Sequence, residues 1–124
     1  MTATLTGANV TFHTQTVPKN ANSEIEIVVT DTTGAIAAQE ANSYGPFAAS
    51  STHGPFPVKV LNQVPKNQLQ PGGSLALNWL PNPTGSAWEF NFNMDLIFSD
   101  GSNIVVDQNG VFLDPAANQA VYGL

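Results

Sequence analysis

The aspartates are the residues of this sequence whose type and spacing could best form a catalytic or metal-binding site. Asp95, Asp100, Asp107 and Asp114 follow one another at intervals of five to seven residues. Two carboxylates that face each other across a cleft can hydrolyse a glycosidic bond, and carboxylates on neighbouring loops can bind calcium. Asp100 and Asp107 are the pair that we expect to hold an ion, if one is bound. Turn formation and a solvated strand face are the competing explanations for all four acids.

Histidine and serine form no recognisable catalytic motif. His13 lies in an alternating segment and His53 in a long polar one, and the sequence has neither a Gly-x-Ser-x-Gly elbow nor a His-Glu-x-x-His pair. Cysteine is absent, which removes thiolate nucleophiles, disulfides and thiolate zinc sites. We therefore expect a protein that is not an enzyme and that needs no cofactor.

A partial calcium-loop pattern begins at Asp107. The run Asp107-Gln108-Asn109-Gly110 matches the start of such a loop, but the later oxygen ligands and the terminal bidentate glutamate are missing. Asn-Gly is also a strong signal for a two-residue hairpin turn. We predict a turn at Asn109 and Gly110, with calcium binding as the alternative.

Neutral polar side chains dominate over charged ones. Only 10% of the residues are charged, so Asn, Gln, Ser and Thr must supply most of the polar surface. Amides bind hydroxyl groups and aromatic rings stack on sugars. Such a surface favours carbohydrate, or another protein surface, as the partner. The candidate ligand-binding residues, taken from the polar loops and from the polar face of one strand, are Tyr44, His53, Asn82, Ser86, Asn91 and Asn93.

The elements that must position these residues are strands. In the segment 87–98 almost every second residue is aromatic or aliphatic, and the intervening positions are mostly Glu, Asn and Asp; a period of two indicates a half-buried antiparallel strand. Asp100-Gly101 then predicts a hairpin turn. Further strands are expected near residues 10–14, 25–29, from 36, and over 57–64, 74–80, 104–106, 111–113 and 120–124.

These eight or nine strands predict one all-β domain over residues 1–124, an antiparallel two-sheet β-sandwich of the jelly-roll or C2-like kind. The long segment 39–55 interrupts the rhythm of strands and turns, and Phe47 and Phe56 are expected to pin it to the core. Val-Pro-Lys-Asn occurs twice, and turn chemistry predicts that Lys19 and Lys66 lie at exposed hairpin tips.

Two short stretches resemble parts of bacterial C2-like or PLAT-like sandwich modules. Residues 13–23 are similar to a calcium loop between two strands, and residues 88–92 with 98–102 are similar to a late strand and its turn. The resemblance implies a β-sandwich. Asn20 and Asn22 stand where the family has acids, so it does not imply calcium binding at this loop.

Charge excludes some partners. The net charge is −6, with three lysines and no arginine, so we expect no nucleic-acid binding, which requires clustered cations. No apolar run approaches the roughly 20 residues of a transmembrane helix, and none is expected. No signal peptide is visible at the N-terminus, which predicts a cytoplasmic protein or export by a non-Sec route.

Three functions remain open at this point. The first is a non-enzymatic recognition module that binds carbohydrate in the manner of a lectin. The second is a self-assembling structural subunit of a shell, fibre or array, and a homo-oligomer is expected in either case. The third is a small membrane-active toxin, which would need Tyr44, Phe47 and Phe56 at the surface.

Overall fold

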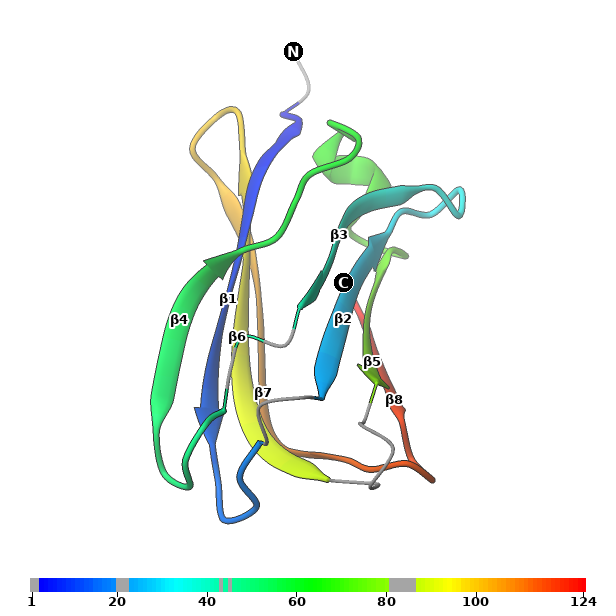
Figure 1. Ribbon diagram of the computed structural model, residues 1–124. Helices are drawn as coiled ribbons and strands as arrows, with labels where there is room; N and C mark the ends of the chain where they lie inside the picture. Colours follow the sequence, from blue (N-terminus) through cyan, green and yellow to red (C-terminus); the bar gives the residue numbers. More distant parts are fainter. Residues whose placement is uncertain (1–2, 20–22, 43, 45, 81–86) are drawn as a thin grey trace.

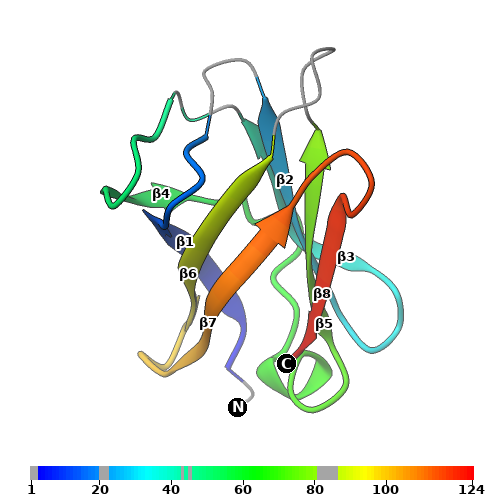
Figure 2. The ribbon, with the colours of Figure 1, turned by 90° about the horizontal axis from the view of Figure 1, so that it is seen from below.

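A computed structural model describes residues 3–19, 23–42, 44, 46–80 and 87–124. The described residues form eight strands in two antiparallel four-stranded sheets, with the strand orders β4-β1-β6-β7 and β3-β2-β5-β8 (Figure 1). The sheets lie face to face when seen from below (Figure 2). The predicted two-sheet β-sandwich is therefore confirmed. The strands are β1 (Leu5–Thr14), β2 (Glu24–Thr30), β3 (Ile36–Asn42), β4 (Thr52–Pro57), β5 (Ser74–Leu80), β6 (Trp88–Phe98), β7 (Asn103–Leu113) and β8 (Gln119–Gly123); a short 3-10 turn, η1 (Lys66–Gln68), precedes β5.

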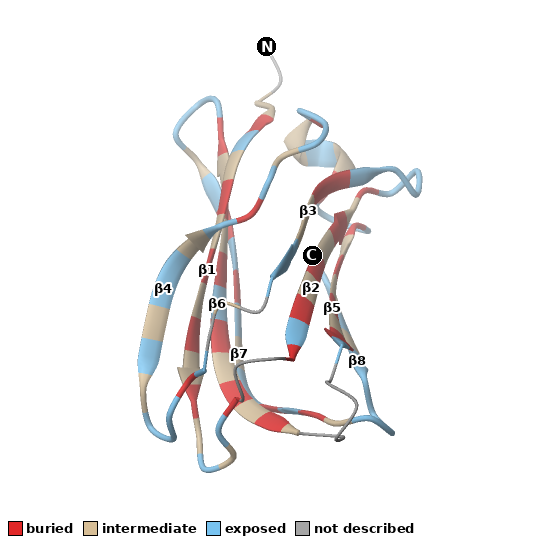
Figure 3. Ribbon diagram, in the orientation of Figure 1, coloured by how far each residue is buried: buried red, intermediate tan, exposed pale blue. Residues whose placement is uncertain are grey.

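The core lies between the sheets and is built from alternate residues of their strands (Figure 3). Strand β6 follows the predicted pattern: every second residue from Trp88 to Phe98 is buried, and the positions between them, Ile97 included, are not. The Trp88 ring stacks on Phe90 with centroids 3.9 Å apart. Its indole N–H donates to the Thr14 hydroxyl at 3.0 Å. The alternating sequence thus places a row of polar side chains, from Glu89 to Asp95, on the outside of β6.

The predicted turn at Asn109 and Gly110 is wrong, because β7 runs through it without a break. Phe90 pairs with Val111 and Phe92 with Gln108, so β7 has one residue more than β6 over this stretch. Gly110 has φ +69, and its N–H donates to Asn91 Oδ1 at 2.8 Å. Asn-Gly favours a turn because glycine readily adopts a left-handed conformation. Here the same conformation of Gly110 forms a β-bulge.

The predicted strand over 57–64 is displaced toward the N-terminus. Strand β4 covers Thr52–Pro57, which begins inside the segment 39–55 that was expected to be a loop, and it pairs only with β1. Its prolines are tolerated because an edge strand has one side without ladder hydrogen bonds. The following residues cross to β3, where Val60 makes one isolated bridge with Ala38.

The two lysines are not at exposed tips, contrary to the sequence prediction. Lys19 is 2% exposed and exchanges two backbone hydrogen bonds with Phe47, and its Nζ lies 5.7 Å from the centroid of the Phe47 ring. Lys66 is half-buried, with Nζ 3.1 Å from Ser102 Oγ and 5.4 Å from the Phe98 ring. Each copy of Val-Pro-Lys-Asn thus brings its ammonium group onto an aromatic ring.

The long connection between β3 and β4 is pinned by aromatic residues, as predicted. Phe47 is buried, and Tyr44 and Phe56 pack against the core from its margin. The rings of Tyr44 and Phe56 lie 4.5 Å apart. The three side chains that a membrane-active toxin would need at the surface therefore face inward. Within the described ranges there is no helix of the length and hydrophobicity needed to cross a membrane.

Candidate functional site

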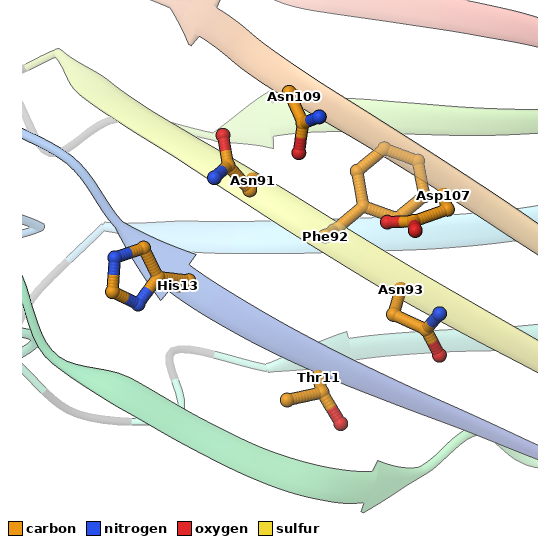
Figure 4. A pocket seen from close by; sticks show the side chains of 7 residues that line it. All are labelled: Thr11, His13, Asn91, Phe92, Asn93, Asp107 and Asn109. Carbon is orange, nitrogen blue, oxygen red and sulfur yellow. The ribbon is translucent and has the colours of Figure 1, made fainter.

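An open depression of about 230 Å³ lies on the outer face of the β4-β1-β6-β7 sheet. Figure 4 shows that its side chains come from three adjacent strands, β1, β6 and β7. Its lining residues are Thr11, His13, Asn91, Phe92, Asn93, Asp107 and Asn109.

Strand register brings these residues together from distant parts of the sequence. His13 pairs with Asn91 in one cross-strand row, and Thr11 pairs with Asn93 in the next. Asn93 in turn pairs with Asp107 on β7. Residues directly opposite on one face have Cβ atoms roughly 5 Å apart, so each row offers adjacent polar groups. Three hydrogen-bonded strands hold the rows in place.

Two of the lining side chains are fixed by the protein itself. His13 Nδ1 lies 2.6 Å from the Thr52 hydroxyl on β4, which orients the ring and leaves Nε2 free of it. The Asn91 oxygen accepts from the Gly110 N–H, so its amide nitrogen is left to donate elsewhere. Both groups are therefore oriented before any ligand arrives.

The other polar lining groups have no internal partner. Within the described part of the chain, the side chains of Thr11, Asn93, Asp107 and Asn109 make no hydrogen bond. Together they present a hydroxyl, two amides and a carboxylate to solvent on a single face. These are donors and acceptors suited to a polar, hydroxyl-rich ligand.

The outer face of the opposite sheet is different, because its amides bind one another. Glu26 accepts from Gln39 at 3.1 Å and from Asn78 at 2.9 Å, and the Asn78 oxygen accepts from Gln119 at 2.8 Å. This polar ladder crosses all four strands of the β3-β2-β5-β8 sheet. Free polar groups are therefore a property of the depression and not of every exposed strand face.

Two carboxylates lie in or beside the depression. Asp107 lines it, and Asp95, which accepts from Asn103 at 3.0 Å, lies in the next row. None of the three lysines is among its lining residues. Coulomb repulsion at this face disfavours an anionic ligand.

Sequence reasoning identified Asn91 and Asn93, and the structure brings them together in the depression. Tyr44 and His53 do not line it. The Tyr44 hydroxyl is buried without a hydrogen-bond partner in the described residues, and burial, helped by the charge of Glu40, raises its pKa to about 12. His53 stacks on Phe47 at 4.2 Å with Nε2 3.0 Å from Ser51 Oγ. These two side chains serve packing.

The remaining predicted site residues are not gathered at one place. Asn82 and Ser86 lie outside the described residues. Asp100 accepts from the N–H and hydroxyl of Ser102 in its own turn, and the hydroxyl bond lowers the pKa of Asp100. Asp107 lies four residues beyond Asn103, the first residue of β7, and strand rise alone makes that about 13 Å.

The structure therefore does not bring Asp100 and Asp107 together. In the ranges it describes, no three or more His, Asp or Glu residues are grouped as metal ligands would be.

No family model, curated protein or solved structure matches the chain. The resemblance of residues 13–23 to a calcium loop accordingly stays a prediction, and Asn20 and Asn22 lie outside the described residues.

The contributions of Thr11, His13 and Asn109 to this face were not predicted. The alternation of residues 10–14 could have placed Thr11 and His13 on an outer face, because they alternate with the apolar residues Val10 and Phe12, which are buried. It could not show that this face adjoins Asn91, since the register between β1 and β6 is set by tertiary pairing.

Proposed function

We propose that this protein is a non-enzymatic carbohydrate-recognition module and that the depression on the β4-β1-β6-β7 sheet is its binding site. The observation that carries the proposal is the set of unpartnered hydroxyl, amide and carboxylate groups of Thr11, Asn93, Asp107 and Asn109 on one face. The corresponding amides on the other sheet are already paired with one another.

Sugar hydroxyl groups donate and accept at once, and the lining groups match both roles. Asp107 only accepts when ionised, whereas the Asn91 amide nitrogen is left to donate. Because the strands and the Thr52 contact of His13 hold these groups in place, binding requires little ordering of the protein. The lining contains one carboxylate, whereas glycoside hydrolysis uses two; this supports binding over catalysis.

A glycan array tests the proposal, with the protein in calcium and again in EDTA. We expect binding to related neutral glycans that Asn93→Ala reduces about tenfold, because a lost pair of hydrogen bonds is worth about 1.4 kcal/mol. Asn67→Ala is the matched control: Asn67 is an exposed amide in η1, remote from the depression. An array without signal in either condition refutes the proposal. Binding lost only in EDTA would instead indicate a calcium-dependent site.

A self-assembling structural subunit is the second candidate, favoured by an apolar row on the outer face of the other sheet. Val28 pairs with Ala76 and Ala76 with Val121, and Val121 on the edge strand β8 is 57% exposed. A second copy could cover this row. Light scattering and electron microscopy over a concentration series test it: large particles that Val121→Asp dissolves support assembly, and a monomer at all concentrations refutes it.

A further inference from the structure

Phe112 is an exposed aromatic residue beside the depression. It lies on β7 opposite Glu89, on the same outer face as Asp107 and Asn109, and is 46% exposed. Its neighbours Val111 and Leu113 are buried. The next outward-facing cross-strand row after that of Asn91 therefore contains a phenyl ring.

The β-bulge at Gly110 is the reason that this ring faces outward. Asp107 and Asn109 point out of the sheet, so uninterrupted alternation would turn Val111 outward and Phe112 inward. The extra residue in β7 reverses this: Val111 is 7% exposed and Phe112 is 46% exposed. The same shift buries Leu113, so β7 turns two aliphatic side chains into the core and the Phe112 ring outward. The fold of β7 therefore holds the Phe112 ring on the outer face, where a ligand in the depression can reach it.

We propose that Phe112 forms a second subsite, on which a pyranose ring stacks while the next unit or units of the same chain occupy the depression. This inference rests on the proposed carbohydrate binding. The row of Asn93 and Asp107 is four β6 residues from the row of Glu89 and Phe112, or about 13 Å of strand. That length exceeds one pyranose ring, so the ligand is a linear oligosaccharide of at least two units.

The carboxylates beside each of the two subsites indicate that the ligand is neutral. Glu89 faces Phe112 across the strands and accepts from the Thr16 hydroxyl at 2.7 Å. Asp107 lies at the other end. A uronic acid at either subsite would place two carboxylates close together, which costs binding energy. A glycan of neutral hexoses or pentoses avoids that repulsion.

Calorimetric titrations with neutral gluco-, manno- and xylo-oligosaccharides of one to four units, and with tetragalacturonate, test the inference. For the neutral series that binds, affinity should rise at least tenfold between the monosaccharide and the tetrasaccharide, and tetragalacturonate should bind at least tenfold more weakly. Phe112→Ala should weaken the tetrasaccharide about tenfold and leave monosaccharide binding unchanged. Phe112→Tyr should retain the wild-type affinity, because it keeps a ring. Val121→Ala, at an exposed apolar residue of the other sheet, is the control for surface truncation.

The outcomes separate this inference from the proposed function. If a neutral tetrasaccharide binds and Asn93→Ala weakens it, but Phe112→Ala does not, the second subsite is refuted and the function stands. If tetragalacturonate binds as well as the neutral chains, the assignment to neutral glycans is wrong. If neither these titrations nor the glycan array detects binding of a neutral glycan, both proposals fail. Melting temperatures of all variants show whether any loss reflects unfolding.

Discussion

Replacing Thr14 with valine should destabilise the protein, because it removes the hydroxyl that accepts a hydrogen bond from a buried indole. Trp88 and Thr14 are both 0% exposed, and the Trp88 N–H donates to the Thr14 hydroxyl at 3.0 Å. Valine has nearly the shape of threonine, so packing changes little, but the N–H is left unsatisfied. Such a group costs about 1–3 kcal/mol, which corresponds to a fall in melting temperature of about 4–12 °C for a chain of this length.

A double-mutant cycle isolates this hydrogen bond from packing effects. Trp88→Phe removes the N–H together with part of the ring, so Thr14→Val in that background leaves no donor unsatisfied and should be nearly neutral. Urea unfolding of the wild type, both single variants and the double variant then gives a coupling energy of about 1–2 kcal/mol. Thr14→Ser, which keeps the hydroxyl, is the matched control. A coupling energy below about 0.3 kcal/mol would refute the reasoning.

Two further predictions concern Asn91 and Lys19. Asn91→Asp keeps the acceptor for the Gly110 N–H and should leave the unfolding free energy within about 0.5 kcal/mol, whereas Asn91→Ala should lower it by about 1 kcal/mol; equal urea midpoints for the two variants would contradict this role. Burial lowers the pKa of Lys19 from 10.5 to about 8, partly offset by Glu24. The unfolded chain therefore binds more protons than the folded one above about pH 8, so stability should rise from there to about pH 10. Lys19→Met should remove that rise. Parallel curves of unfolding free energy against pH for the wild type and the variant would show that Lys19 is not its source.

The predictions from the sequence were most accurate where the alternation of residues within a single strand determines which side chains are buried. The faces of β6 follow from the alternation between Trp88 and Phe98, and the polar row with Asn91 and Asn93 was identified for that reason. The turn at Asp100-Gly101 was also correct, since Gly101 has φ +84. In both cases the deciding interactions are local or follow a period of two.

Predictions failed where a distant segment decides the local structure. Asn-Gly suits a turn or a bulge equally well, because both need a left-handed residue; the Asn91 side chain on the neighbouring strand holds Gly110 in the bulge. Lys19 was expected to be exposed because nothing near it in the sequence shows that Phe47 lies against it. Thr11 and His13 join the depression only through the pairing of β1 with β6.

The strand order of the β4-β1-β6-β7 sheet also determines the order in which the residues of the depression are expected to assemble during folding. Strands β6 and β7 form a hairpin through a short turn, and local pairing of this kind takes roughly 1–10 μs. Strand β1, by contrast, pairs Leu5 with Phe98 across most of the chain, and non-local β-pairing sets folding times of roughly milliseconds to seconds. We therefore expect the hairpin to bring Asn93 and Asp107 together first, and the later pairing of β1 to add Thr11. We expect a ligand that contacts both β1 and β7 to bind only the completed sheet, and so to slow unfolding by linking the N-terminal strand to the hairpin.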